Sequence, residues 1–180
     1  GETVTMKAIW NACEHTITYD ANGGSGAPAD QIKKYGEQLF LRKEKPTRIG
    51  YSFLGWSCSI GGTYKPGDEY THDQNGGKVT MKGIWSDNIP PLISELKAEP
   101  NTWSSGNGTI SVTALDQGSG INKIELKRKS FVTNVTTTVK TWNHFGTTQQ
   151  VKDIYTELNE GVYVYTIIVT DVAGNSSQKT

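Results

Sequence analysis

The residues best suited to metal chemistry in this 180-residue chain are acids and amides in short, turn-rich segments. They are Asp87, Asn88, Asp116, Asp171 and Asn175. Oxygen ligands of this kind suit Ca²⁺, which takes about six to eight of them. If the segments meet at one end of a domain, they predict a Ca²⁺ site there. The alternative is that each side chain caps its own turn through a local backbone hydrogen bond.

The cysteines and histidines offer less chemistry. Cys13 and Cys58 could form one disulfide, or they could remain two buried thiols. The histidines, His15, His72 and His144, lie far apart in no nucleophile or metal motif. His15 follows Cys13 by two residues, but zinc needs about four ligands, so the pair is weak evidence for a metal. We therefore expect no enzyme activity and no required cofactor.

Two residue sets could instead contact a polymer. Lys123, Lys127 and Lys129 alternate along one face of a predicted strand and could bind a glycan or a cell-wall polymer. Solvated lysines that discourage strand pairing are the alternative. Trp103 and Trp142 could stack on sugar rings, although aromatic residues in small sandwich domains also serve the core. These five residues are the candidate ligand contacts.

Composition and charge exclude several classes of partner. Lys plus Arg and Asp plus Glu both number 18, so the chain has no net charge. It lacks the basic excess expected of a protein that binds nucleic acid or a membrane surface. No apolar run approaches the roughly 20 residues that span a bilayer. With 34% hydrophobic residues and 20 glycines, the composition favours small β domains with many turns.

A ten-residue segment occurs twice in the chain. Residues 1–10 and 76–85 are identical at seven of the ten positions, including Val, Thr, Met, Lys, Ile and Trp. Duplication of this kind is typical of repeat arrays, which often serve as scaffolds or stalks. We interpret residues 1–12 as the last strand of a truncated upstream repeat, either frayed or borrowing an edge from a neighbour. Further repeats are then expected in the full-length protein.

Residues 13–86 form the first complete unit, with strand patterns and turns but no long helical period. Its motifs are Tyr-Asp-Ala-Asn-Gly-Gly, Tyr-Gly-Glu, Pro-Thr-Arg-Ile-Gly-Tyr, Phe-Leu-Gly-Trp and a final Ile-Trp. In this order they resemble the internalin-type B repeat, also called the Listeria–Bacteroides repeat. The resemblance implies a small β-grasp-like domain found in tandem in secreted, cell-wall-attached bacterial proteins. It also implies that Trp56 and Trp85 serve packing, whereas the two cysteines are not part of the pattern.

Residues 87–91 read as a semi-rigid linker because of their two prolines, and residues 92–180 as a second domain. Seven short strands predict an immunoglobulin-like β-sandwich for this domain, so the fold class is mostly β. The expected strands cover residues 93–98, 109–115, 122–129, 134–140, 148–154, 161–170 and a last one from about 176. The domain resembles the bacterial immunoglobulin-like domains of cell-surface proteins. In such a sandwich the acidic segments would share one end, where Ca²⁺ would stiffen the junction with the preceding repeat.

The chain is therefore interpreted as a non-catalytic stalk or spacer of a bacterial cell-surface protein, either attached to the cell wall or secreted. Its expected role is to present distal domains, as suits independently folded β units joined by semi-rigid linkers. One alternative is an adhesive module that binds a host protein or a glycan. Another is an accessory domain of a secreted glycan-active enzyme. No nucleic-acid partner and no membrane span are expected in this fragment.

Overall fold

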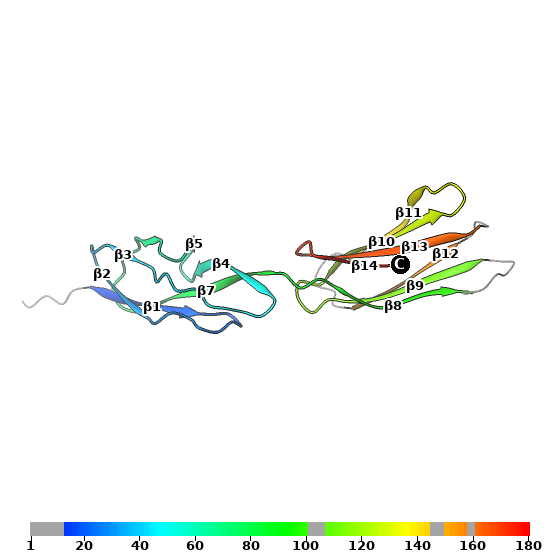
Figure 1. Cartoon of the computed structure of the whole chain (residues 1–180). Coiled ribbons are helices and arrows are strands. Elements are labelled where there is room, and N and C mark those ends of the chain that lie inside the picture. The colour runs from blue at the N-terminus through cyan, green and yellow to red at the C-terminus, as the bar shows by residue number, and fades with distance from the viewer. Residues whose placement is uncertain (1–12, 101–106, 145–149, 158–160) are drawn as a thin grey trace, which may run out of the picture. The chain divides into compact units, whose positions relative to one another are not determined.

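The computed structural model describes residues 13–100, 107–144, 150–157 and 161–180 as an all-β chain (Figure 1). It divides into two compact units, Gly1–Ser86 and Asp87–Thr180. The predicted mostly-β class is confirmed. The expected orphan strand at residues 1–12 lies outside the described residues. No described segment forms a long apolar helix of the kind that crosses a membrane.

The first unit is built on a five-stranded mixed sheet of order β2-β1-β7-β4-β5. β1 and β7 run parallel at its centre, and a separate pair of short strands, β3 and β6, runs antiparallel. The sheet strands are β1 (Glu14–Asp20), β2 (Gln31–Lys34), β4 (Tyr51–Cys58), β5 (Thr63–Tyr64) and β7 (Lys78–Asp87). The short pair is β3 (Leu39–Phe40) and β6 (Glu69–Tyr70). The second copy of the duplicated segment thus becomes a central strand.

The core of the first unit follows the alternation of β1 and β7. Ile17 pairs in register with Val79, and Tyr19 pairs with Met81, so all four side chains lie on the inner face. Trp56 from β4 is fully buried and packs edge-on against Tyr19, with ring centroids 5.0 Å apart. Burying each large apolar side chain contributes about 1.5–3 kcal/mol. These contacts therefore supply much of the stability of the unit.

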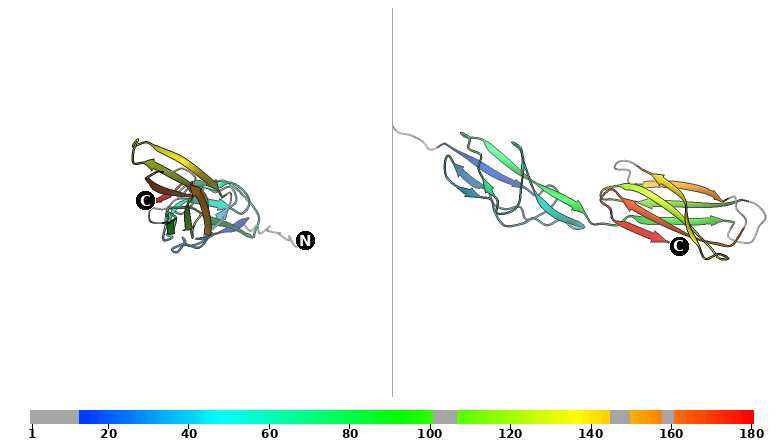
Figure 2. Two further views of the ribbon diagram at one scale, coloured as in Figure 1. Left: turned by 90° about the vertical axis from the view of Figure 1, so that its right-hand side faces the viewer. Right: turned by 90° about the horizontal axis from the view of Figure 1, so that it is seen from above.

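The second unit is a sandwich of two antiparallel sheets, as Figures 1 and 2 show. One sheet has the order β11-β10-β13-β14 and the other β12-β9-β8. The strands are β8 (Leu92–Glu99), β9 (Gly108–Leu115), β10 (Ile121–Ser130), β11 (Thr136–Asn143), β12 (Gln150–Glu157), β13 (Tyr163–Asp171) and β14 (Ser176–Lys179). The seven strands divide four and three between the sheets, as in an immunoglobulin-like fold. This part of the fold prediction is confirmed.

The core of the sandwich lies between the inner rows of the two sheets. In one sheet, Ile124 pairs with Val169 and Leu126 with Ile167 across β10 and β13, and all four are fully buried. The facing row on β9 is Ile110, Val112 and Ala114. Strict alternation along these strands places apolar side chains inward and polar ones outward. The register therefore determines which loops adjoin at each end of the unit.

Candidate metal centre

Strand register brings three acidic positions of the second unit together. Ile121 at the start of β10 pairs with Asp171 at the end of β13, so the loop before β10 adjoins the loop after β13. Leu92 at the start of β8 pairs with Leu115 at the end of β9, immediately before Asp116. Asp87, five residues before β8 begins, reaches the same end of the unit. Pairing of the strands thus assembles residues that lie more than eighty positions apart.

Asp87, Asp116 and Asp171 form a compact group of carboxylates. Each offers one oxygen, and these oxygens all lie within 4.8 Å of one another. The residues are only 6%, 1% and 0% exposed. Among the described residues, none of the ion pairs joins a lysine, arginine or histidine to this group. Burial of a charge is costly unless the charge is paired or coordinates a metal.

Backbone amides hold two of these carboxylates in place. Oδ2 of Asp116 accepts hydrogen bonds from the amides of Gly118 and Gly120, at 3.1 and 2.6 Å. Oδ1 of Asp87 accepts one from the Ile89 amide at 2.9 Å, and its Oδ2 accepts one from the Ser119 amide at 2.7 Å. The turn-capping alternative is therefore correct for both residues. It does not account for the remaining oxygen of Asp116, because Oδ1 is buried without a hydrogen-bond partner among the described residues.

Asn175 supports the third carboxylate. Its backbone amide donates to Oδ1 of Asp171 at 2.7 Å, and its side-chain amide donates to Oδ2 at 2.8 Å. The same side-chain nitrogen donates to the backbone oxygen of Asp87 at 3.1 Å. Asn175 thus positions two members of the group. Asn88 follows Asp87 in the chain and is exposed, unlike the three buried carboxylates.

The considered disulfide between Cys13 and Cys58 is not formed, because both residues are free thiols. Cys58 ends β4 and Cys13 precedes β1, and β7 lies between these two strands in the sheet. Two strand spacings of about 4.8 Å already exceed the roughly 7 Å limit on the Cα separation in a disulfide. Cys58 instead belongs to the core of the first unit.

The structure places the candidate polymer contacts in different surroundings. Lys123 pairs with Glu125 at 3.1 Å, Lys127 is half-buried and Lys129 is exposed. Their strand β10 is internal, between β11 and β13, so the lysines do not guard a sheet edge as the alternative supposed. Trp142 packs against the sandwich core, which argues against a freely presented stacking platform. Trp103 lies outside the described residues.

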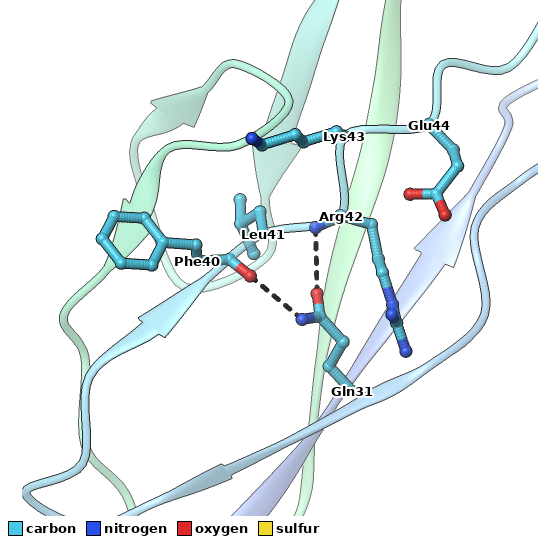
Figure 3. A pocket seen from close by; sticks show the side chains of 6 residues that line it. All are labelled: Gln31, Phe40, Leu41, Arg42, Lys43 and Glu44. Carbon is cyan, nitrogen blue, oxygen red and sulfur yellow. Dashed lines mark hydrogen bonds between the residues drawn. The ribbon is translucent and has the colours of Figure 1, made fainter.

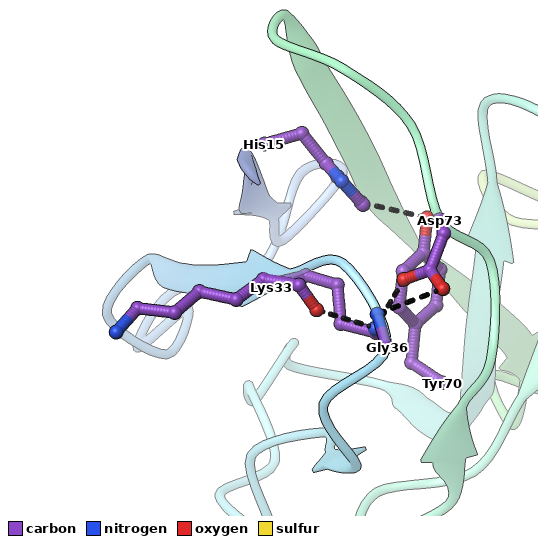
Figure 4. Close-up of polar contacts among 6 residues, drawn as sticks. His15, Lys33, Gly36, Tyr70 and Asp73 are labelled. Atoms are coloured by element: carbon purple, nitrogen blue, oxygen red, sulfur yellow. Dashed lines mark hydrogen bonds and ion pairs between the residues drawn. The ribbon is translucent and has the colours of Figure 1, made fainter. Parts of the chain in front are cut away.

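A polar network on the first unit was not predicted from the sequence (Figure 4). The buried Lys33 of β2 forms an ion pair with Asp73, whose other oxygen accepts the Gly36 amide at 3.1 Å. Nearby, Nε2 of His15 lies 3.2 Å from the hydroxyl of Tyr70. Hydrogen bonding by Lys33 lowers the pKa of Asp73, and burial raises the pKa of Tyr70 to about 12. The network fastens β2 to the segment that follows β6.

Gln31 and residues 40–44 line a depression beside β3 (Figure 3). The Gln31 side chain crosses it, donating to the Phe40 carbonyl at 3.0 Å and accepting the Arg42 amide at 3.1 Å. Its amide is therefore committed to joining β2 to the chain that follows β3. The charged residues Arg42, Lys43 and Glu44 also line the depression. The Gln31 hydrogen bonds thus stabilise the fold.

Signature residues of the first unit form a second structural network. Asn22 adopts a left-handed conformation with φ of 49°, and its side chain donates to the Gly83 carbonyl at 2.9 Å. The indole nitrogen of Trp85 donates to the Ala21 carbonyl at 2.9 Å. A β-carbon on Gly24 would lie 2.6 Å from the Trp85 ring, so only glycine fits there. These motif residues close the turn after β1 onto the end of β7.

Residues 15–83 match the family model of the Listeria-Bacteroides repeat domain. The match covers the turn, the core and the polar network of the first unit, and the repeat family is found in surface proteins. No curated protein shows significant similarity to the chain. The match ends before the second unit. The sandwich fold of that unit is established by its strands, and its family stays a prediction from sequence.

Proposed function

We propose that the chain is a non-catalytic spacer segment of a bacterial cell-surface protein, secreted or attached to the cell wall, that presents more distal domains. The supporting observation is that motif residues of the repeat have structural roles. Asn22, Gly24, Trp56 and Trp85 are all committed to turn closure or to packing. Motif residues that serve packing and turn closure favour a structural role for the repeat over a binding role.

Separate cores support the same proposal. Among the described residues, the buried apolar side chains form two clusters, one in each unit, so each unit has the means to fold by itself. Arrays of such units extend in length by adding domains, without redesign of an interface. This property suits a protein that must hold a functional domain away from a cell wall.

Surface display tests the spacer. A reporter domain is anchored on a bacterium directly, or through residues 1–180, and the binding of a large antibody to the reporter is measured. The spacer proposal expects markedly greater antibody binding when the chain is present. A scrambled, unfolded linker of equal length is the control for length alone. Equal binding with and without the chain would contradict the proposal.

An adhesive role is a second candidate because the hairpin between β10 and β11 exposes apolar side chains. Phe131 is 75% exposed, Val132 is 88% exposed and Val135 is also exposed. Exposed apolar groups gathered at a loop tip are a common feature of contact surfaces. Adhesion of the display strain to host matrix proteins or glycans, lost in Phe131→Ser with Val132→Ser, would favour this role. Adhesion indistinguishable from that of the bare strain would favour the spacer.

A further inference from the structure

We propose that Asp87, Asp116 and Asp171 bind one Ca²⁺ ion within the second unit. The negative charge of this group favours a bound cation. The three carboxylates approach within 4.8 Å and are nearly excluded from solvent, and the described ion pairs provide no cation for them. Three like charges at this separation repel strongly in a medium of low polarity. A divalent cation is the simplest group that removes this repulsion.

One carboxylate oxygen of Asp116 lacks a hydrogen-bond partner among the described residues. Asp116 is 1% exposed, and its Oδ2 already accepts two loop amides. Its Oδ1 is buried and makes no hydrogen bond to the part of the chain that the structure describes. Buried polar atoms are nearly always satisfied, so an orphaned carboxylate oxygen beside two other carboxylates indicates a missing ligand. A cation seated among the three residues would satisfy this oxygen directly.

The three carboxylates are preorganised by hydrogen bonds. Backbone amides and the Asn175 side chain donate hydrogen bonds to the carboxylates of all three residues. Outer contacts of this kind orient the ligands of a metal before it binds. The three aspartates come from three separate segments of the chain. The ion would therefore tie the segment at Asp87 to the loops that follow β9 and β13.

The ligand set favours Ca²⁺ over Mg²⁺ and zinc. All of the candidate donors are oxygen atoms, whereas structural zinc sites use sulfur and nitrogen. Mg²⁺ keeps several waters and usually takes one or two carboxylates, but Ca²⁺ accepts more oxygens in a less regular shell. Backbone carbonyls and waters would complete the shell around three carboxylates. Extracellular Ca²⁺ modules typically bind with a Kd of about 10⁻⁴ to 10⁻³ M.

Calorimetry on the whole chain tests the site. After treatment with EGTA, the 180-residue chain is titrated with CaCl2, and in parallel with MgCl2 at equal ionic strength. One Ca²⁺ per chain is expected, with a Kd near or below about 10⁻³ M and weaker binding of Mg²⁺. Thermal scans should show one transition moving up with Ca²⁺, because ligands that bind only the folded state stabilise it. No binding and no shift at about 10 mM Ca²⁺ would overturn the proposal.

Isosteric variants locate the ion. Asp116→Asn and Asp171→Asn keep an acceptor for the loop amides but remove a charge, and each should weaken Ca²⁺ binding at least about tenfold. Asp153→Asn is the control, because Asp153 belongs to the same unit but pairs with His144. It should leave Ca²⁺ binding unchanged. Circular dichroism confirms folding of each variant. Undiminished binding by folded Asp116→Asn would overturn the assignment, and if that variant does not fold, the wild-type titration decides.

Discussion

A β-carbon added to Gly118 would lie 1.9 Å from Oδ2 of Asp87. No real side chain approaches another atom this closely, so the Asp87 carboxylate occupies the space that a larger residue at position 118 would need. The same oxygen accepts the amide of the next residue, Ser119, at 2.7 Å. Glycine at position 118 is therefore what lets the Asp87 carboxylate enter the loop and reach Asp116.

Gly118→Ala should displace the Asp87 carboxylate, although the variant retains all three aspartates. We expect the affinity for Ca²⁺ to fall at least about tenfold, and the second unit to lose roughly 1–3 kcal/mol from overpacking. Gly108→Ala is the matched control, because its added β-carbon meets only the Glu99 carbonyl at an ordinary 3.7 Å. Calorimetric titration and thermal unfolding measure both effects. Equal behaviour of the two variants would argue against a role for Asp87.

Gly24→Ala should destabilise the first unit. The added β-carbon would lie 2.6 Å from the Trp85 ring and 2.7 Å from the Thr47 carbonyl, and the backbone oxygen cannot move away cheaply. We expect a loss of roughly 1–3 kcal/mol, read from urea unfolding followed by tryptophan fluorescence. Ser25→Ala, at an exposed neighbouring position, should change stability little. A neutral Gly24→Ala would show that the turn relaxes more readily than its packing implies.

Alkaline pH should weaken the first unit through Tyr70. Burial raises the pKa of Tyr70 to about 12, above its value of about 10 in an unfolded chain. Its contribution is therefore complete below about pH 10 and is lost as the pH rises toward 12, by roughly 2–3 kcal/mol. Tyr70→Phe should flatten this dependence, whereas Tyr35→Phe, at an exposed site, should not. Urea unfolding across this pH range measures the slope.

Acid should weaken the first unit through Asp73. The hydrogen bond from Lys33 lowers the pKa of Asp73 below its ordinary value of about 4. The carboxylate thus stabilises the fold above that ordinary value, and its contribution is lost as the pH falls through the lowered folded-state pKa. Thermal scans between about pH 6 and pH 2 should show a smaller acid dependence for Asp73→Asn. Asp30→Asn, at an exposed position, should retain the wild-type dependence.

Strand alternation predicted the architecture because apolar side chains repeat every second residue along β1, β9, β10 and β13. The same rule failed on β2, where Ile32 is 49% exposed and Lys33 is 3% exposed. The inward lysine is explained by Asp73, forty positions later in the chain. Short-range patterns carry no information about such a distant partner. The rule of apolar residues inside therefore gives way where a buried cation has its own counterion.

The acidic group was predictable in outline and not in detail. An immunoglobulin-like fold places the loops that contain Asp116 and Asp171 at one end, so their proximity was predictable from the strand order. Burial, spacing and the orphaned Asp116 oxygen depend on strand register and loop packing, which sequence alone does not provide. The exposure of Asn88 beside the buried Asp87 also depends on the strand's orientation, since adjacent residues in an extended segment point in opposite directions.

Mechanical unfolding tests the central claim, that the chain is a spacer of two independently folded units. Single molecules held at residues 1 and 180 are stretched, and unfolding events are counted with EGTA and then with Ca²⁺. We expect two separate force peaks per molecule, because each unit has its own core. A single cooperative event, or extension without a force peak, would contradict the account.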